Sequence, residues 1–309
     1  MRVVIIAAAF FVVSTSVVIL AILPYLVTGS LINNPISFAT THEPETFGVK
    51  VQDLTLTTAD ELTLQAWEVA VEDPKAVVIM LGGLSNPSVT AFWGHARLFA
   101  EHGYASFLLE MRAHGASEGA QVGLGYEEHL DVLAALTYLQ EQQSYEDVPV
   151  VVFGVDLGGV AAINAVGLYP ELGGLISIGA FSSWAGLFTD NLYFSGTPLC
   201  IALLEKPFVK LYTIAKFGWS QRHIFPQKQI ANLGHRPALL MHSREDEQVS
   251  LLNLERLQLS APSHAEFWVR DGAEHLVCTD FLYPEEDPVY TQRILRFLED
   301  NFTKQPLSQ

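Results

Sequence analysis

The feature that most constrains the fold is a series of short apolar runs without polar alternation, each followed by a helical pattern. Strands buried on both faces of a parallel sheet have this composition, whereas half-exposed strands alternate apolar and polar residues. The runs are residues 76–81, 105–109, 148–153, 175–178, 238–241 and 265–269. The helical patterns are residues 91–101, 126–141, 157–168, 251–259 and 289–302. This order predicts an α/β fold with a doubly wound, mostly parallel sheet.

Two segments ahead of the first run do alternate apolar and polar residues. They are residues 49–56 and 62–69, and the polar turn Thr58-Ala59-Asp60-Glu61 joins them. We therefore expect an antiparallel pair at a sheet edge. Residues 181–232 form an insertion rich in Phe, Tyr, Trp, Leu and Pro between two predicted strands. An insertion this apolar must be packed, either as a lid over the carboxyl edge of the sheet or as extra core helices.

Composition excludes several classes of protein. The chain has 309 residues, of which half are hydrophobic, so it is not a disordered chain. Two cysteines are too few for a disulfide framework or a Cys-rich zinc site. A net charge of −17 argues against nucleic acid as the partner, since that binding depends on clustered Lys and Arg. Neither a dinucleotide fingerprint nor a P-loop is present in the sequence, and we expect no cofactor and no metal.

The first thirty residues form a separate segment. Residues 3–27 carry no charge and are long enough to span a bilayer as a helix, so we predict a single-pass transmembrane anchor over residues 1–29. A cleaved signal peptide and a buried core helix are the alternatives. Arg2 and the positive-inside rule place the N-terminus in the cytoplasm and the domain outside it. Residues 30–48, rich in Gly, Ser, Thr, Asn and Pro, are predicted to be a linker to an α/β domain at residues 49–309.

The segment Gly154-Val155-Asp156-Leu157-Gly158-Gly159 follows one predicted strand and precedes a helix. This is the context of a nucleophile elbow, in which small residues flank a strained residue whose side chain projects above the sheet. The usual Ser is replaced by Asp156. The alternative is that Asp156 caps the helix that follows it.

Two further strand ends carry candidate site residues. Asp246 follows the run at residues 238–241, and an acid there can orient an imidazole. His275 lies on a short loop after the run at residues 265–269. The chain order of nucleophile, acid and His, each at a strand end, is the order of α/β hydrolases. Backbone N–H groups after Leu81, together with that of Leu157, can form an oxyanion hole.

These motifs make residues 50–303 resemble the α/β-hydrolase superfamily, especially its serine-aminopeptidase-like, esterase-like branch. Further motifs that carry the resemblance are Asp60-Glu61-Leu62-Thr63-Leu64, Arg112-Ala113-His114-Gly115-Ala116-Ser117, Gly123-Leu124-Gly125-Tyr126-Glu127 before Asp131, and His242 with Val249 around Asp246. The resemblance implies that Asp246 is the triad acid, His275 the general base, and Gly83 with Leu157 the oxyanion donors. The chain departs from the pattern at Leu81, where the branch has His, and at Asp156.

A carboxylate nucleophile changes the chemistry. Attack on an ester would give an anhydride and expel a far more basic alkoxide, whereas displacement at saturated carbon gives an alkyl ester of Asp156 that water can cleave. Haloalkane dehalogenases and epoxide hydrolases of the superfamily use Asp at this position. By that resemblance, Trp184 and Trp219 are candidate halide donors, and Tyr193 and Tyr212 are candidate proton donors to an opening epoxide; packing is the alternative role for each.

Three functions remain open on this evidence. The first is a membrane-anchored hydrolase that uses an Asp156–His275–Asp246 triad on a small apolar substrate. The second is a degenerate relative that binds a ligand or partner without turnover. The third is an ordinary esterase or peptidase that tolerates Asp156.

Overall fold

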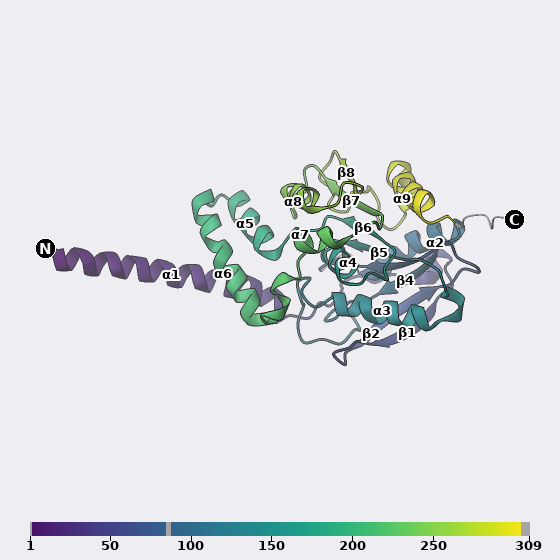
Figure 1. The fold of residues 1–309 in the computed structure, drawn as a ribbon, viewed down its shortest axis with the longest axis horizontal. Helices are drawn as coiled ribbons and strands as arrows, with labels where there is room; N and C mark the ends of the chain where they lie inside the picture. The colour runs from purple at the N-terminus through teal and green to yellow at the C-terminus, as the bar shows by residue number, and fades with distance from the viewer. Residues whose placement is uncertain (1, 85–87, 304–309) are drawn as a thin grey trace.

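An eight-stranded sheet forms the centre of the computed structural model, which describes residues 2–84 and 88–303 (Figure 1). The strands are β1 (Gln52–Thr57), β2 (Thr63–Val69), β3 (Val77–Leu81), β4 (Ala105–Leu109), β5 (Val150–Val155), β6 (Gly174–Ile178), β7 (Ala238–Ser243) and β8 (Glu266–Arg270). Their order is β1-β2-β4-β3-β5-β6-β7-β8. β2 is antiparallel to both of its neighbours, and all other pairs are parallel. The predicted mostly parallel sheet with an antiparallel edge pair is confirmed.

Helices cover both faces of this sheet (Figure 1). Those flanking it are α2 (Trp93–Glu101), α3 (His129–Glu141), α4 (Leu157–Leu168), α8 (Leu252–Ser260) and α9 (Pro288–Asn301). Alternate residues of one strand enter different cores: Ile79 packs in the core under α3, α4 and α8, and Met80 in the core under α2 and α9. Burial on both faces explains why the central strands lack polar alternation.

The last strand is less buried than its apolar run predicts. Every residue of β8 is half-buried, whereas β3 to β7 are buried throughout. β8 pairs only with β7 and forms the edge of the sheet, so one side of its backbone has no neighbouring strand to cover it.

The insertion at residues 181–232 is helical. It contains α5 (Trp184–Phe194), α6 (Leu199–Phe217), a 3₁₀ turn at Ser220–His223, α7 (Pro226–Gln229) and a second 3₁₀ turn at Ile230–Asn232. The start of α5 joins the main core through Trp184 and Phe188, while α6 runs outward beside α1 (Figure 1).

The N-terminal apolar segment forms α1 (Arg2–Ile32), whose first half projects away from the domain (Figure 1). Its second half packs on the domain. The indole N–H of Trp184 donates to the Thr28 hydroxyl at 3.1 Å, and the Val122 N–H donates to the Ile32 carbonyl at 2.9 Å. Thr28 and Ile32 are fully buried. The last two turns of α1 are thus built into the domain.

Within the part of the chain that the structure describes, no helix combines the length and the hydropathy needed to cross a membrane. The transmembrane helix predicted over residues 1–29 is therefore not supported. The C-terminal part of the apolar run instead packs on the domain: Ile32 is buried in the main core, and Leu23 and Leu31 pack against it.

The segment between α1 and β1 lies against the domain. Ile36 forms a bridge with His114, and the Trp93 indole N–H donates to the His42 carbonyl at 2.8 Å. A 3₁₀ helix at Pro44–Phe47 then buries Phe47 in the core under α2 and α9.

Candidate active site

Asp156 stands in a strained turn between β5 and α4. Its backbone has φ 51° and ψ −117°, a region that residues with a side chain rarely occupy. Glycines make the turn possible. A Cβ on Gly154 would lie 2.0 Å from the Gly158 carbonyl oxygen, and one on Gly158 would lie 2.3 Å from the Gly82 carbonyl oxygen. The strand, the helix and the loop after β3 therefore approach one another more closely than side chains would allow.

The side chain of Asp156 does not cap its own helix: no cap hydrogen bond is found among the described residues. Its Oδ2 instead accepts a hydrogen bond from the backbone N–H of Leu84, in the loop after β3, at 2.8 Å. The capping interpretation of Asp156 therefore does not describe its carboxylate, which points across the sheet edge toward that loop.

His275 lies between two carboxylates. Its Nδ1 is 2.7 Å from Asp246 Oδ2, within hydrogen-bond distance, and its Nε2 lies 3.9 Å from Asp156 Oδ1. The side chain of Asp156 is 17% exposed and that of His275 is 9% exposed. Nε2 is buried and has no hydrogen-bond partner within residues 2–84 and 88–303. The structure thus brings the three predicted residues together, with one imidazole nitrogen held and the other free.

Asp246 is fixed by its own turn. Its Oδ1 accepts from the backbone N–H groups of Gln248 at 2.8 Å and Val249 at 3.0 Å. His242, at the end of β7, donates from Nε2 to the Val249 carbonyl at 2.7 Å and thereby fixes the far side of the turn. A carboxylate held in this way can set the ring orientation of His275 and keep its proton on Nδ1.

The pKa of His275 is raised above its usual 6.5. Burial acts in the opposite direction, since it disfavours the charged ring. The hydrogen bond to Asp246 and the negative charges of Asp156 and Asp246 together outweigh that effect. The two carboxylates thus favour the charged ring more than burial disfavours it.

The predicted oxyanion donors lie on two segments. Gly83 is in the loop after β3, and Leu157 is the first residue of α4; their role as donors stays a prediction. The Leu84 carbonyl lies 3.1 Å from His114 Nε2, a contact that ties the loop to the segment after β4. Residues 85–87 lie outside the described part of the chain.

Sequence reasoning missed two positions in this site. The N–H of Leu84, one residue beyond the predicted Gly83, is the group that contacts Asp156. Gly179 follows β6 with φ 62°, and a Cβ there would lie 3.0 Å from Cε1 of His275. A glycine at the end of a predicted strand beside the elbow was a signal for such a close approach.

The four aromatic residues predicted from the insertion contact other groups. Trp219 is exposed, and its ring packs against the Arg222 guanidinium at 4.3 Å. Trp184 donates its N–H to Thr28, and the Tyr212 ring packs edge-on against Tyr25 at 6.0 Å between centroids. Tyr193 is 45% exposed and contacts Phe194. Trp184 and Tyr212 are thus packed against α1, and their proposed roles toward substrate remain predictions.

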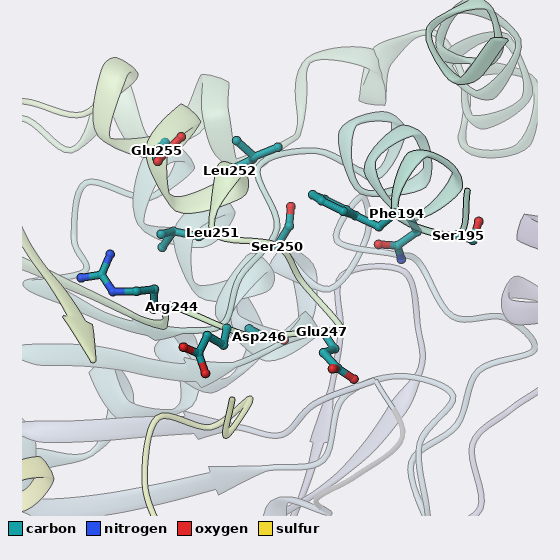
Figure 2. A pocket seen from close by; sticks show the side chains of 11 residues that line it. Phe194, Ser195, Arg244, Asp246, Glu247, Ser250, Leu251, Leu252 and Glu255 are labelled. Atoms are coloured by element: carbon teal, nitrogen blue, oxygen red, sulfur yellow. The ribbon is translucent and has the colours of Figure 1, made fainter. Parts of the chain in front are cut away.

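A cavity of about 720 Å³ borders the acid of the triad. Figure 2 shows Phe194 from the end of α5 and Leu251 from the start of α8 around it, with Asp246 at its edge. Its lining includes neither Asp156 nor His275. The cavity places the end of α5 next to the loop after β7.

Arg112 itself is part of the scaffold, although His114 of the same motif contacts the loop after β3. The buried Arg112 guanidinium pairs with Asp131 at 2.8 Å and with Asp60 at 2.9 Å. Asp60 and Asp131 both belong to sequence motifs that carry the resemblance. Their ion pairs with Arg112 explain why those motifs contain acidic residues. Across the described ranges, no group of three or more His, Cys, Asp or Glu side chains could hold a metal ion.

Residues 72–230 match the model of the family described as serine aminopeptidase, S33. This segment is more than half of the chain and contains the elbow. The chain belongs to the serine aminopeptidase S33 family. The matched segment ends before Asp246 and His275, so the family assignment and the triad geometry are independent observations.

Relatives and solved structures agree on the fold of this family member. It is 22% identical to Bacillus subtilis YqkD over 244 residues, and the aligned region covers 77% of this chain and 75% of YqkD. It is 25% identical over 129 residues to the Saccharomyces cerevisiae membrane protein YNL320W, covering 42% of this chain and 45% of that one. The Pyrococcus furiosus esterase Pf2001 superposes with a TM-score of 0.68 at 23% identity, covering 88% of this chain and 98% of that chain. A Pyrococcus horikoshii acylaminoacyl peptidase superposes with a TM-score of 0.61 at 17% identity, and the match covers 84% of this chain and 43% of the peptidase chain. At these identities the solved structures show the α/β-hydrolase fold alone.

Proposed function

We propose that this protein hydrolyses a small apolar substrate through an alkyl ester of Asp156. The observation that carries the proposal is the line Asp246–His275–Asp156, with 2.7 Å at one end of the imidazole and 3.9 Å at the other. The carboxylate at the elbow replaces the Ser that ester cleavage uses, and a carboxylate is suited to displacement at saturated carbon.

The first step makes a carbon–oxygen bond. Asp156 Oδ1 attacks the substrate carbon, and the leaving group departs with the bonding electron pair as halide or alkoxide. In the second step His275 Nε2 takes a proton from water, and the oxygen of that water attacks Asp156 Cγ. The bond from Cγ to Oδ1 then breaks, the proton on His275 passes to the departing alkoxide, and the product alcohol carries the old carboxylate oxygen.

The hydrogen bond from Leu84 supports this second step. Oδ2 of Asp156 bears the negative charge of the tetrahedral intermediate, and the Leu84 N–H already lies 2.8 Å from it. Fixed donors at the atom where charge develops are worth about 3–4 kcal/mol in comparable sites. The N–H of Leu157, next in the chain, is the second donor in this proposal.

Labelled water tests the ester intermediate. Wild-type protein is incubated with haloalkane, epoxide and ester panels in heavy-oxygen water, digested, and analysed by mass spectrometry. After repeated turnover we expect the label in the peptide that contains Asp156, because each cycle exchanges one carboxylate oxygen. His275→Gln should accumulate the alkyl ester as a mass increase on that peptide, and Asp156→Asn should show neither signal.

His264→Gln is the matched control, since His264 is exposed and contacts only the Arg236 carbonyl among the described residues. It should turn over as wild type does. Turnover with the label confined to the product, and none in Asp156, would contradict the ester route.

One observation favours a second candidate function, a binding protein without turnover. The Leu84 N–H donates its hydrogen bond to Asp156, so it is not free to stabilise the carbonyl oxygen of an ester substrate. In that case the labelled peptide stays unchanged with every panel, while a ligand still raises the unfolding temperature of the wild type.

We also propose that the first half of α1 associates with a membrane, with the N-terminus on the cytoplasmic side. Most of its described side chains are apolar and exposed, among them Val4, Phe10 and Phe11. Exposed apolar surface of this extent is unusual in a monomeric soluble protein. The printed name of the yeast relative, a membrane protein, points the same way.

A further inference from the structure

A second cavity, separate from the triad, lies in the insertion. Its volume is about 380 Å³, and it lies between α6 and the segment that contains the 3₁₀ turn Ser220–His223 and α7. Four basic side chains line it, together with the hydroxyls of Tyr126 and Thr213; they are Lys206, Lys210, Arg222 and His223. No Asp or Glu of the described residues is among its lining.

The insertion differs in charge from the rest of the chain. Residues 191–236 contain six of the 17 Lys and Arg residues but only one of the 34 Asp and Glu residues, which is Glu205. That acid does not line the cavity. The insertion is therefore a basic region of a strongly acidic protein. Three of its six Lys and Arg residues, Lys206, Lys210 and Arg222, line the cavity.

The Lys and Arg side chains that line the cavity form no direct ion pair with a carboxylate of the described residues, although the charge of Asp190 acts on Lys206. No ion pair in the described part of the chain involves Lys206, Lys210 or Arg222. Arg222 instead stacks over the Trp219 ring at 4.3 Å. The neighbouring Arg256 is neutralised by Asp190.

Lys206 and Lys210 face the cavity because they are one helical turn apart on α6, and Thr213 continues the same face. Lys206 is half-buried, and burial together with the charges of Arg256 and Lys210 lowers its pKa. Two ammonium groups and a guanidinium thus line the same cavity. Their mutual repulsion raises the free energy of the folded protein, and a bound anion would offset that repulsion.

We propose that this cavity binds a phosphate group, as a free ion or as the headgroup of an anionic lipid. Phosphate is matched by a cluster of Lys and Arg, since it accepts several charge-assisted hydrogen bonds at once. Nothing in this proposal requires turnover at Asp156.

The surroundings of the cavity favour a lipid as the source of the phosphate group. α6 exposes Leu203, Leu204 and Leu211, each between 50% and 63% accessible, on its outer face. Figure 1 shows α6 beside α1, whose first half carries exposed apolar side chains. A helix with apolar and basic faces is typical of binding at the surface of an anionic membrane.

The test uses full-length protein and two probes. Inorganic phosphate is titrated by calorimetry, and vesicles of phosphatidylcholine with or without phosphatidylserine are used in a flotation assay. The test variant is Lys206→Gln with Lys210→Gln. The control is Lys50→Gln with Lys228→Gln, which makes the same charge change at two exposed lysines outside the cavity.

We expect wild type to bind phosphate, anionic vesicles, or both, and the test variant to bind at least about tenfold more weakly, since two charge-assisted hydrogen bonds are lost. The control should bind within about twofold of wild type. Binding of phosphate without vesicles assigns a soluble ligand, and binding of anionic vesicles alone assigns a lipid headgroup; either outcome supports the proposal.

Three outcomes would overturn it. Wild type binds no phosphate and floats equally with and without phosphatidylserine, or the test variant keeps the affinity of wild type, or the control loses as much affinity as the test variant. Thermal unfolding without ligand verifies that both variants are folded. Because no substrate is present, the result does not depend on the labelling experiment at Asp156.

Discussion

At the scale of single residues, His275 decides how the site responds to pH. Its ring is held by Asp246 on one side and faces Asp156 on the other, and its pKa is raised above 6.5. The general base of the proposed second step is the neutral ring, because an imidazolium cannot take a proton from water.

We expect the pKa of His275 in the free enzyme to lie above 6.5, and to fall in Asp156→Asn, which removes one of the charges that raise it. The measurement is an NMR titration of the imidazole across a pH series, and the rate of ester hydrolysis should rise with pH as the ring loses its proton. A free-enzyme pKa at or below 6.5 would contradict the raised pKa of His275. The effect on stability has the opposite sign: the charged ring stabilises the fold fully below the unfolded-state pKa, and that contribution is lost as pH rises through the folded-state pKa.

At the scale of elements, the elbow depends on the contact between α4 and the loop after β3. A Cβ on Gly158 would lie 2.3 Å from the Gly82 carbonyl oxygen and 2.5 Å from that of Leu81. Backbone atoms cannot move aside as the end of a flexible side chain can, so the helix would have to shift.

Gly158→Ala should lower the free energy of unfolding by about 3 kcal/mol or more, as overpacking against backbone does. Urea denaturation measures this change. Gly173→Ala is the control, because its nearest new contact is 3.4 Å from Pro149 Cβ, an ordinary distance. We expect the control to stay within about 0.5 kcal/mol of wild type. A small loss for Gly158→Ala would mean that the elbow is looser than its geometry indicates.

At the scale of the whole molecule, one end of α1 is exposed and the other end is packed on the domain. Its first half extends from the domain with exposed apolar side chains, and its last turns bury Thr28 and Ile32. One continuous apolar run therefore serves two purposes, and deletions can separate them.

We expect removal of residues 2–21 to leave the unfolding temperature within about 2 °C of wild type, because the contacts of Thr28 and Ile32 remain. Removal of residues 2–33 should lower it by about 5 °C or more, since the Trp184 and Val122 N–H groups lose their partners. In cell fractionation, the shorter deletion should already move the protein out of the membrane pellet. Unchanged pelleting would contradict the proposed association through α1, and equal stability of both deletions would contradict its packing role.

Much of this architecture follows from local sequence pattern. The uninterrupted apolar runs mark the central strands because a strand covered on both faces has no polar side to show. Gly154 and Gly158 around Asp156 mark the elbow, because a turn this tight excludes Cβ atoms. Asp246 and His275 were found from chain order alone, and in the structure the two side chains meet at 2.7 Å.

Tertiary structure alone decided the rest, because it depends on which surfaces meet. Pattern cannot distinguish an apolar helix end that packs on α5 from one that extends freely, since both require the same side chains. Nor does it show that Leu84 donates to Asp156, or that Lys206, Lys210 and Arg222 converge on one hollow. Those contacts arise from folding the insertion back on the sheet, which brings together groups that local periodicity leaves unrelated.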